Sequence, residues 1–177
     1  HLPLFPTRRS SDLGLRFAAY LLQREAWEDL SKLVIDIRQN MLQSESLTSL
    51  SYYLEGRAAL AQQRPLDTET AFRKIADYRL SSAEVALYVA SDLVRLRYPE
   101  LATRVLRQHE AELQTHPHYW ELIFNLAFEA KDPERLLHAA DMSRKLRTNS
   151  PVALVNYAAA LLVNRQQPEE ALRLTLQ

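Results

Sequence analysis

Prolines recur in this chain at a nearly constant spacing. Pro65, Pro99, Pro133 and Pro168 are separated by 34, 34 and 35 residues, and Pro117 and Pro151 form a second set 34 residues apart. Proline is favoured in the first turn of a helix, where its missing N–H and fixed φ cost nothing. A period of this size predicts stacked pairs of helices and not a single globular core. We therefore expect an all-α solenoid.

Apolar periodicity and turn residues divide the chain into ten helices in about five antiparallel hairpins. We expect them at 14–24, 26–41, 47–63, 67–78, 82–97, 99–114, 117–130, 133–147, 151–165 and 168–177. Asp132 is expected to cap the helix that Pro133 opens. The segment Ser81-Ser82-Ala83-Glu84 is expected to form a capping box at the start of the helix at 82–97. Because no linker between these helices is long enough to divide domains, residues 14–177 should form one continuous array.

The first residues stand apart from this pattern. Residues 5–13 read Phe-Pro-Thr-Arg-Arg-Ser-Ser-Asp-Leu, which resembles the translation of a common sequencing adapter. We interpret residues 1–13 as a non-native, disordered arm; a natural basic arm is the alternative.

The far end of the chain also stands apart. The chain stops at Gln177 inside a helical pattern and has no initiator Met, so we expect a fragment truncated at its C-terminus. An uncapped solenoid end predicts self-association, here through Leu172 and Leu176.

Composition excludes several classes of function. Gly14 and Gly56 are the only glycines, which is too few for a phosphate-binding loop or a dinucleotide fingerprint. The absence of cysteine excludes disulfides and Cys-ligated zinc but does not determine the compartment, for which the cytoplasm is our default expectation. The net charge of +0 gives no general attraction to nucleic acid or acidic membranes. No apolar run is long enough for a membrane span. We therefore expect no cofactor, no metal and no catalysis.

The hairpins resemble tetratricopeptide repeats. That pattern has a large residue, a large–small pair three residues later, another large residue three further on, and a small residue early in the second helix. The places are filled in one repeat by Trp120, Ile123, Phe124, Ala127, Leu136 and Ala140, and in the next by Val155, Ala158, Ala159, Leu162 and Ala171. They are filled in earlier repeats by Ala86, Val89, Ala90, Leu93 and Ala102, and by Tyr52, Glu55, Gly56, Ala59 and Phe72. The resemblance implies a right-handed superhelix whose small residues let paired helices approach closely.

Some positions depart from the pattern. Glu55 occupies a place expected to lie in the core, and Phe124 and Leu136 replace small residues. The first hairpin is divergent, because about 40 residues separate Glu25 from Pro65. The resemblance therefore covers residues 14–177 but is strongest from residue 82 onwards.

The resemblance implies a protein-interaction scaffold that binds a peptide or protein on the concave face formed by the first helices. The residues expected to line that face are Tyr53, Arg57, Leu60, Leu87, Ser91, Arg95, Glu121, Asn125, Phe128, Asn156 and Asn164. Rigid aromatic and planar polar side chains suit peptide recognition. A solvated inner face without a ligand is the alternative for these residues.

Two other functions remain open. Arrays of this kind are often fused to catalytic domains, so the chain can be a non-catalytic region of a larger enzyme, such as a glycosyltransferase or a signalling kinase. It can also be a helical-repeat RNA-binding protein. The neutral charge and the apolar Leu87 and Phe128 on the expected inner face count against RNA.

Overall fold

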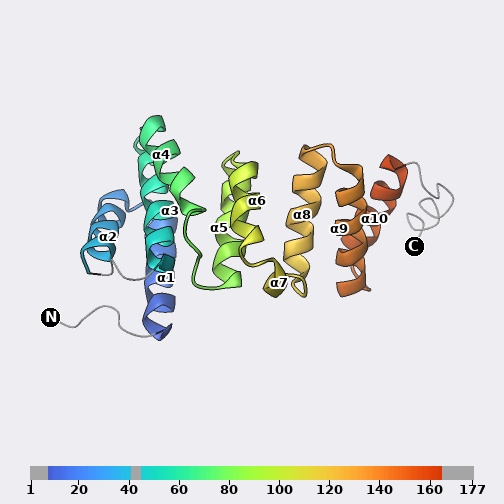
Figure 1. The fold of residues 1–177 in the computed structure, drawn as a ribbon, viewed down its shortest axis with the longest axis horizontal. Helices are drawn as coiled ribbons and strands as arrows, with labels where there is room; N and C mark the ends of the chain where they lie inside the picture. Colours follow the sequence, from blue (N-terminus) through green and yellow to red (C-terminus); the bar gives the residue numbers. More distant parts are fainter. Residues whose placement is uncertain (1–7, 41–44, 165–177) are drawn as a thin grey trace. The chain divides into compact units, whose positions relative to one another are not determined.

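The computed structural model describes residues 8–40 and 45–164, and all regular structure in these ranges is helical (Figure 1). The helices are α1 (Arg8–Gln23), α2 (Trp27–Asn40), α3 (Glu45–Ala61), α4 (Pro65–Ile75), α5 (Ala83–Arg95), α6 (Pro99–Arg107), α7 (Glu110–Leu113), α8 (Pro117–Glu129), α9 (Pro133–Leu146) and α10 (Pro151–Val163). The chain forms two compact units. Of the described residues, the first unit comprises 8–40, 45–90 and 100–108, and the second comprises 91–99 and 109–164.

Most of the expected helix boundaries hold closely; among the described residues, the exceptions lie at the start of the chain and within residues 99–114. Helix α1 begins at Arg8 and not at residue 14, so residues 8–13 are described as helix and not as a disordered arm. The adapter origin of residues 5–13 stays a prediction, and residues 1–7 lie outside the described residues. The helix expected at 168–177 and the self-association through Leu172 and Leu176 also fall outside them.

One turn recurs between paired helices in the part of the chain that the structure describes. There, four residues other than glycine have positive φ, namely Glu25 (54°), Gln63 (57°), Arg97 (72°) and Lys131 (54°). At the last of these, Lys131 N–H donates to the carbonyl of Phe128 and Asp132 N–H donates to the carbonyl of Ala127. The same two bonds recur at the other three turns. This is the left-handed helix ending that normally favours glycine.

The next helix begins two residues after each positive-φ residue. That place holds Pro65, Pro99 and Pro133 in three turns and Trp27 in the first. The proline period therefore marks this turn, as predicted. The divergent first hairpin closes with the same backbone geometry but without proline.

Replacing Lys131 by glycine should stabilise the protein, although glycine usually destabilises helical proteins. A side chain in the left-handed region costs about 1 kcal/mol or more, part of which is offset by the greater freedom of glycine in the unfolded chain. We expect the free energy of unfolding to rise by about 0.5–1 kcal/mol in urea denaturation. Lys131→Ala is the control, because its Cβ keeps the strain; equal stabilisation by both variants would contradict this account.

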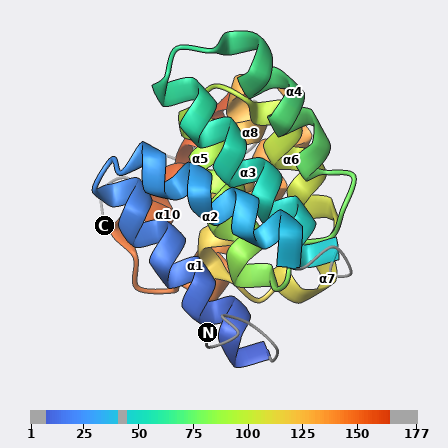
Figure 2. The same ribbon diagram turned by 90° about the vertical axis from the view of Figure 1, so that its left-hand side faces the viewer.

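In the first unit, α2 lies beside α3 and α3 beside α4 (Figures 1 and 2). The core includes Leu30, Leu54, Phe72 and Ile75, which are all almost fully buried. A Cβ atom built on Gly56 would overlap two carbons of the Phe72 ring. Glycine therefore lets α3 and α4 approach closely, as the small-residue place predicts.

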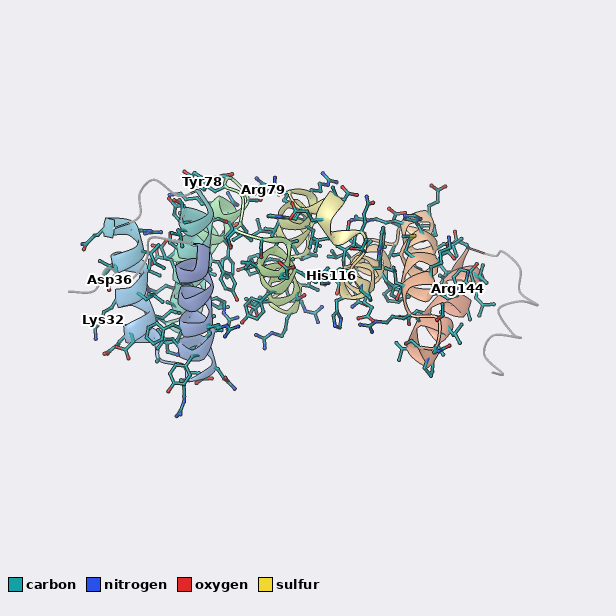
Figure 3. All side chains as sticks on the ribbon, turned by 90° about the horizontal axis from the view of Figure 1, so that it is seen from below. Lys32, Asp36, Tyr78, Arg79, His116 and Arg144 are labelled. Carbon is teal, nitrogen blue, oxygen red and sulfur yellow. The ribbon has the colours of Figure 1, made fainter. Side chains whose placement is uncertain are left out.

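Glu55, which occupies an expected core place, is only half-buried and pairs with Arg38 of α2. Nη1 of Arg38 lies 3.2 Å from Oε1 of Glu55, and its Nη2 pairs with Oε2. The same guanidinium lies 4.8 Å from the centre of the Tyr52 ring, and Lys74 lies 5.1 Å from it. Tyr78, labelled in Figure 3, stacks on Tyr52 with a centroid distance of 6.1 Å. The charge of Glu55 is thus compensated by Arg38, which joins α2 to α3.

The helix expected at 99–114 is instead divided into α6 and α7. Gln108 leaves the helical path, and its side-chain amide donates to the carbonyl of Ala76 at the end of α4, at 2.8 Å. His109 then adopts φ −126° as a buried N-cap residue of α7. The break therefore supplies a hydrogen bond to the last turn of another helix, which periodicity cannot reveal.

In the second unit, α8, α9 and α10 share one hydrophobic cluster. Its buried members are Ala127, Leu136, Ala140 and Ala160, and Phe124, Leu137 and Tyr157 lie against them. The predicted core places in α8 and α9 are therefore confirmed. The predicted cap of α9 is confirmed, because Asp132 accepts a hydrogen bond from the N–H of Arg135. At α5, Ser82 accepts a hydrogen bond from the N–H of Val85, and the helix begins at Ala83. This cap lies one residue later than the predicted capping box at residues 81–84 implies.

The predicted core places of α10 are only partly buried. Ala158 is fully buried, but Val155 and Leu162 are each 54 % exposed and Ala159 is also exposed. These three residues follow one another at helical spacing on one side of α10. The helix expected to cover that side, at 168–177, lies outside the described residues.

Candidate functional site: the exposed face of α8

Helix α8 presents two very different faces. Tyr119, Ile123, Leu126 and Ala127 are buried on one side. On the other side lie His118, Glu121, Asn125 and Phe128, spaced so that they share one stripe of the helix. We call these four residues the α8 face. The sequence predicted three of them, Glu121, Asn125 and Phe128, as binding residues, and the structure brings those three together.

Phe128 is the most unusual member of the α8 face. Its side chain is 64 % exposed, although the other aromatic residues of α8 are buried or half-buried. Burial of a phenylalanine side chain stabilises a protein by about 1.5–3 kcal/mol relative to leaving it in water. An exposed Phe128 does not contribute this stabilisation to the fold. One exposed apolar residue is common on protein surfaces. Phe128 is a candidate contact residue because polar side chains lie beside it on the same face.

Glu121 is held in place from two directions. Arg147, which follows α9, donates from Nη1 to Oε1 of Glu121 at 2.5 Å. Nδ1 of His118 lies 2.9 Å from Oε2 of Glu121, and Nε2 of His118 lies 3.4 Å from Nη2 of Arg147. These contacts suit an imidazole whose Nδ1 donates to Glu121 and whose Nε2 accepts from Arg147. The carboxylate is therefore fixed on the helix and already neutralised.

A second ion pair lies at the other end of the α8 face. Nη1 of Arg97, in the turn after α5, lies 3.6 Å from Oε1 of Glu129, the last residue of α8.

Arg97, Arg147 and His118 were not among the predicted site residues. Sequence spacing offered no signal for Arg147, because it lies 26 residues from Glu121 and reaches it only through the α8–α9 packing.

The remaining predicted residues of the second unit have different environments. Ser91 is exposed, and Arg95 donates from Nε to Oδ1 of Asp92 at 3.2 Å. Asn156 is half-buried on α10. Asn164 donates to the carbonyls of Pro133 and Ala160, at 2.7 and 3.0 Å. Its amide therefore ties the end of α10 to the start of α9, which is a role in the fold.

The predicted residues of the first unit differ in how far they are buried. Tyr53 is 1 % exposed and lies edge-on against Tyr88, with a ring-centroid distance of 6.5 Å. The predicted exposure of Tyr53 is therefore wrong, because its ring belongs to the core. Arg57 and Leu87 are half-buried, and Leu60 is 37 % exposed.

Tyr119 and Asp141, neither of which belongs to the α8 face, have shifted pKa values. Burial raises the pKa of the Tyr119 hydroxyl, and nearby Glu110 adds to the increase while Arg135 opposes it. Burial also acts to raise the pKa of Asp141, but hydrogen bonds from Lys145 and Arg144 outweigh it and lower the pKa. Arg144, labelled in Figure 3, also lies over the Tyr157 ring at 4.6 Å. Arg144 thus connects α9 to α10, and its ion pair with Asp141 lies within α9.

The residues that the structure describes contain no constellation typical of metal binding. No group of three or more His, Asp or Glu side chains among them is arranged to hold a metal ion. None of the described helices has both the length and the apolar character that crossing a membrane requires. The α8 face itself holds one exposed apolar ring, one exposed amide and a carboxylate that is already paired.

Comparisons with known proteins identify the fold. The structure is similar to that of PilF from Pseudomonas aeruginosa, with a TM-score of 0.57 and 17 % sequence identity over 92 % of this chain and 72 % of PilF. It is also similar to YrrB, a tetratricopeptide-repeat protein with an unusual peptide-binding site, with a TM-score of 0.55 and 17 % identity over 91 % of this chain and 80 % of YrrB. The sequence matches no family model and no curated protein. The chain thus has a tetratricopeptide-like, all-helical repeat fold.

Proposed function

We propose that this chain is a protein-interaction module and that the α8 face binds an extended peptide segment of a partner protein. The observation that carries the proposal is the 64 % exposure of Phe128 beside Asn125 and the fixed Glu121. Aromatic side chains are frequent energetic anchors of interfaces. The peptide-binding site of YrrB, a protein of similar fold, also supports this reading.

Asn125 supplies the directional part of the proposed contact. Its side-chain amide is exposed, and it can donate to one backbone carbonyl and accept from one backbone N–H of an extended peptide. Asn125 and Phe128 lie three residues apart on α8, so one peptide can contact both. Ser91 and Arg95 remain proposed contacts in the same unit, together with Asn156, and Arg57 and Leu87 in the first unit. Tyr53 is not a proposed contact because its side chain is buried. Asn164 is not a proposed contact because its amide already donates to two backbone carbonyls.

The test uses a display library of random twelve-residue peptides, selected against the wild-type protein. Phe128→Ala should weaken the binding of selected peptides at least about tenfold, because the anchor is lost. Asn125→Ala should weaken it less, about three- to tenfold. Affinities would be measured by isothermal titration calorimetry, and thermal unfolding would verify that both variants fold.

Leu66→Ala is the matched control, because Leu66 is an apolar side chain that is 79 % exposed on α4. This variant should bind selected peptides like the wild type. Selection of no peptide at all, or equal losses for Leu66→Ala and Phe128→Ala, would contradict the proposed function.

A further inference from the structure

Two ion pairs lie at the ends of the α8 face. Glu121 is paired with Arg147 and contacted by His118, and Glu129 is paired with Arg97. Eight residues separate the two glutamates, which corresponds to about 12 Å along the helix axis. Asn125 and Phe128, the uncharged members of the face, lie between them. Each glutamate on this stretch of helix therefore has an arginine partner.

This arrangement determines which charges a ligand would meet. Arg147 and Glu121 are both mostly buried, with side chains that are 33 % and 29 % exposed. An incoming carboxylate would have to displace Glu121 from Arg147, and an incoming cation would have to displace Arg147 from Glu121. Either exchange replaces one ion pair with another and adds the cost of removing water from the ligand's own charge. A charged ligand therefore gains little at this place.

An uncharged segment meets no such cost. A large apolar side chain of the ligand can cover Phe128, and the amide of Asn125 can satisfy the ligand's backbone groups. The paired charges at the ends of the face then act as a polar rim that stays in contact with water. Apolar burial and one amide contact account for binding without any change in the ion pairs.

We infer that the partner segment crossing α8 carries no net charge and places a large apolar residue against Phe128. The inference rests on the proposed function and specifies the chemistry of the ligand. An acidic peptide, a basic peptide, a nucleic acid and a second copy of this chain are the other possible occupants, and each has a different signature in the test.

The test analyses the peptides that the display library yields on the wild-type protein. Their contact region should be rich in leucine, isoleucine, methionine or phenylalanine and have a net charge near zero. The affinity of a selected peptide should change less than about twofold between about 50 and 500 mM sodium chloride. A strong bias towards acidic or basic peptides, or a tenfold loss of affinity with salt, would overturn the inference.

A second measurement uses a variant in which Arg147 no longer has a carboxylate partner. Glu121→Gln removes the partner of Arg147, so it should bind an acidic version of a selected peptide about fivefold more tightly than the wild type does, in a salt-dependent manner. Glu69→Gln is the matched control, because it releases Arg73 from an exposed ion pair on α4. It should leave the affinity unchanged. An unchanged affinity in Glu121→Gln would contradict the view that Arg147 is neutralised.

The outcomes separate the inference from the proposed function. If Phe128→Ala abolishes binding but the selected peptides are charged, the function stands and the inference fails. Single-stranded DNA and RNA oligonucleotides, tested in the same titration, should not compete with the peptide. Sedimentation across a concentration series should show that Phe128 does not mediate self-association. Competition by an oligonucleotide, or dimers that Phe128→Ala abolishes, would overturn the inference.

Discussion

Replacing Trp120 by alanine will lower the free energy of unfolding by about 4 kcal/mol. The Trp120 side chain is 6 % exposed, and its Nε1 donates to the carbonyl of Gln114 at 2.7 Å. Its ring contacts Tyr119 and His138 edge-on, with centroid distances of 4.9 and 5.2 Å. Removal of a buried tryptophan typically costs 3–5 kcal/mol through the cavity that it leaves, and here it also leaves a carbonyl without its donor.

Urea denaturation followed by circular dichroism measures this effect, and Trp27→Ala is the matched control. Trp27 is half-buried at the start of α2, where its first-turn position does not require an indole ring. The control should therefore cost about 1–2 kcal/mol, in proportion to the smaller area buried. A loss below about 1 kcal/mol for Trp120→Ala, or equal losses in the two variants, would show that Trp120 is not the anchor of its hairpin.

Replacing Gly56 by alanine should destabilise the protein even though alanine is the better helix former. The added methyl group would overlap the ring of Phe72, which is 1 % exposed and enclosed by the core. Overpacking costs about 1–3 kcal/mol or more, against a propensity gain of about 1 kcal/mol. Because the overlap is with two ring carbons, we expect a net loss of about 2 kcal/mol in the free energy of unfolding, measured by urea denaturation.

The double variant Gly56→Ala/Phe72→Leu distinguishes a steric conflict from a general weakening of α3. Phe72→Leu alone removes ring volume from the core and should destabilise the protein by about 1 kcal/mol. In the double variant the smaller side chain makes room for the new methyl group, so the two losses should not add. Additive losses would mean that Gly56 and Phe72 do not interact, which would contradict the close approach of α3 and α4.

Much of the fold can be predicted from local sequence, because helix starts, turns and caps are determined by residues only a few positions apart. The proline period predicted the recurring turn because proline suits the first helical position, which follows two residues after each positive-φ residue. Asp132 was predictable as a cap because its side chain accepts a hydrogen bond from the N–H three residues ahead. Gly56 was identifiable because only a small residue permits close helix contact.

Other features required contacts between distant parts of the chain. At the break between α6 and α7, Gln108 donates to the carbonyl of Ala76, 32 residues away. Glu55 is accommodated by Arg38, 17 residues earlier. Neither partner can be inferred from periodicity, because periodicity reports which face of a helix is apolar and not which side chains meet across the interface.

The candidate site likewise combines features that helix periodicity determines with features that only tertiary contacts determine. Sequence alone placed Glu121, Asn125 and Phe128 on one face of one helix, since 3.6 residues per turn bring positions three and four apart together. Tertiary structure alone buried Tyr53 in the core and brought Arg147 to Glu121. The physical reason is one of range. Backbone geometry and helix periodicity act over a few residues, whereas burial and charge pairing depend on how helices pack once the chain has folded.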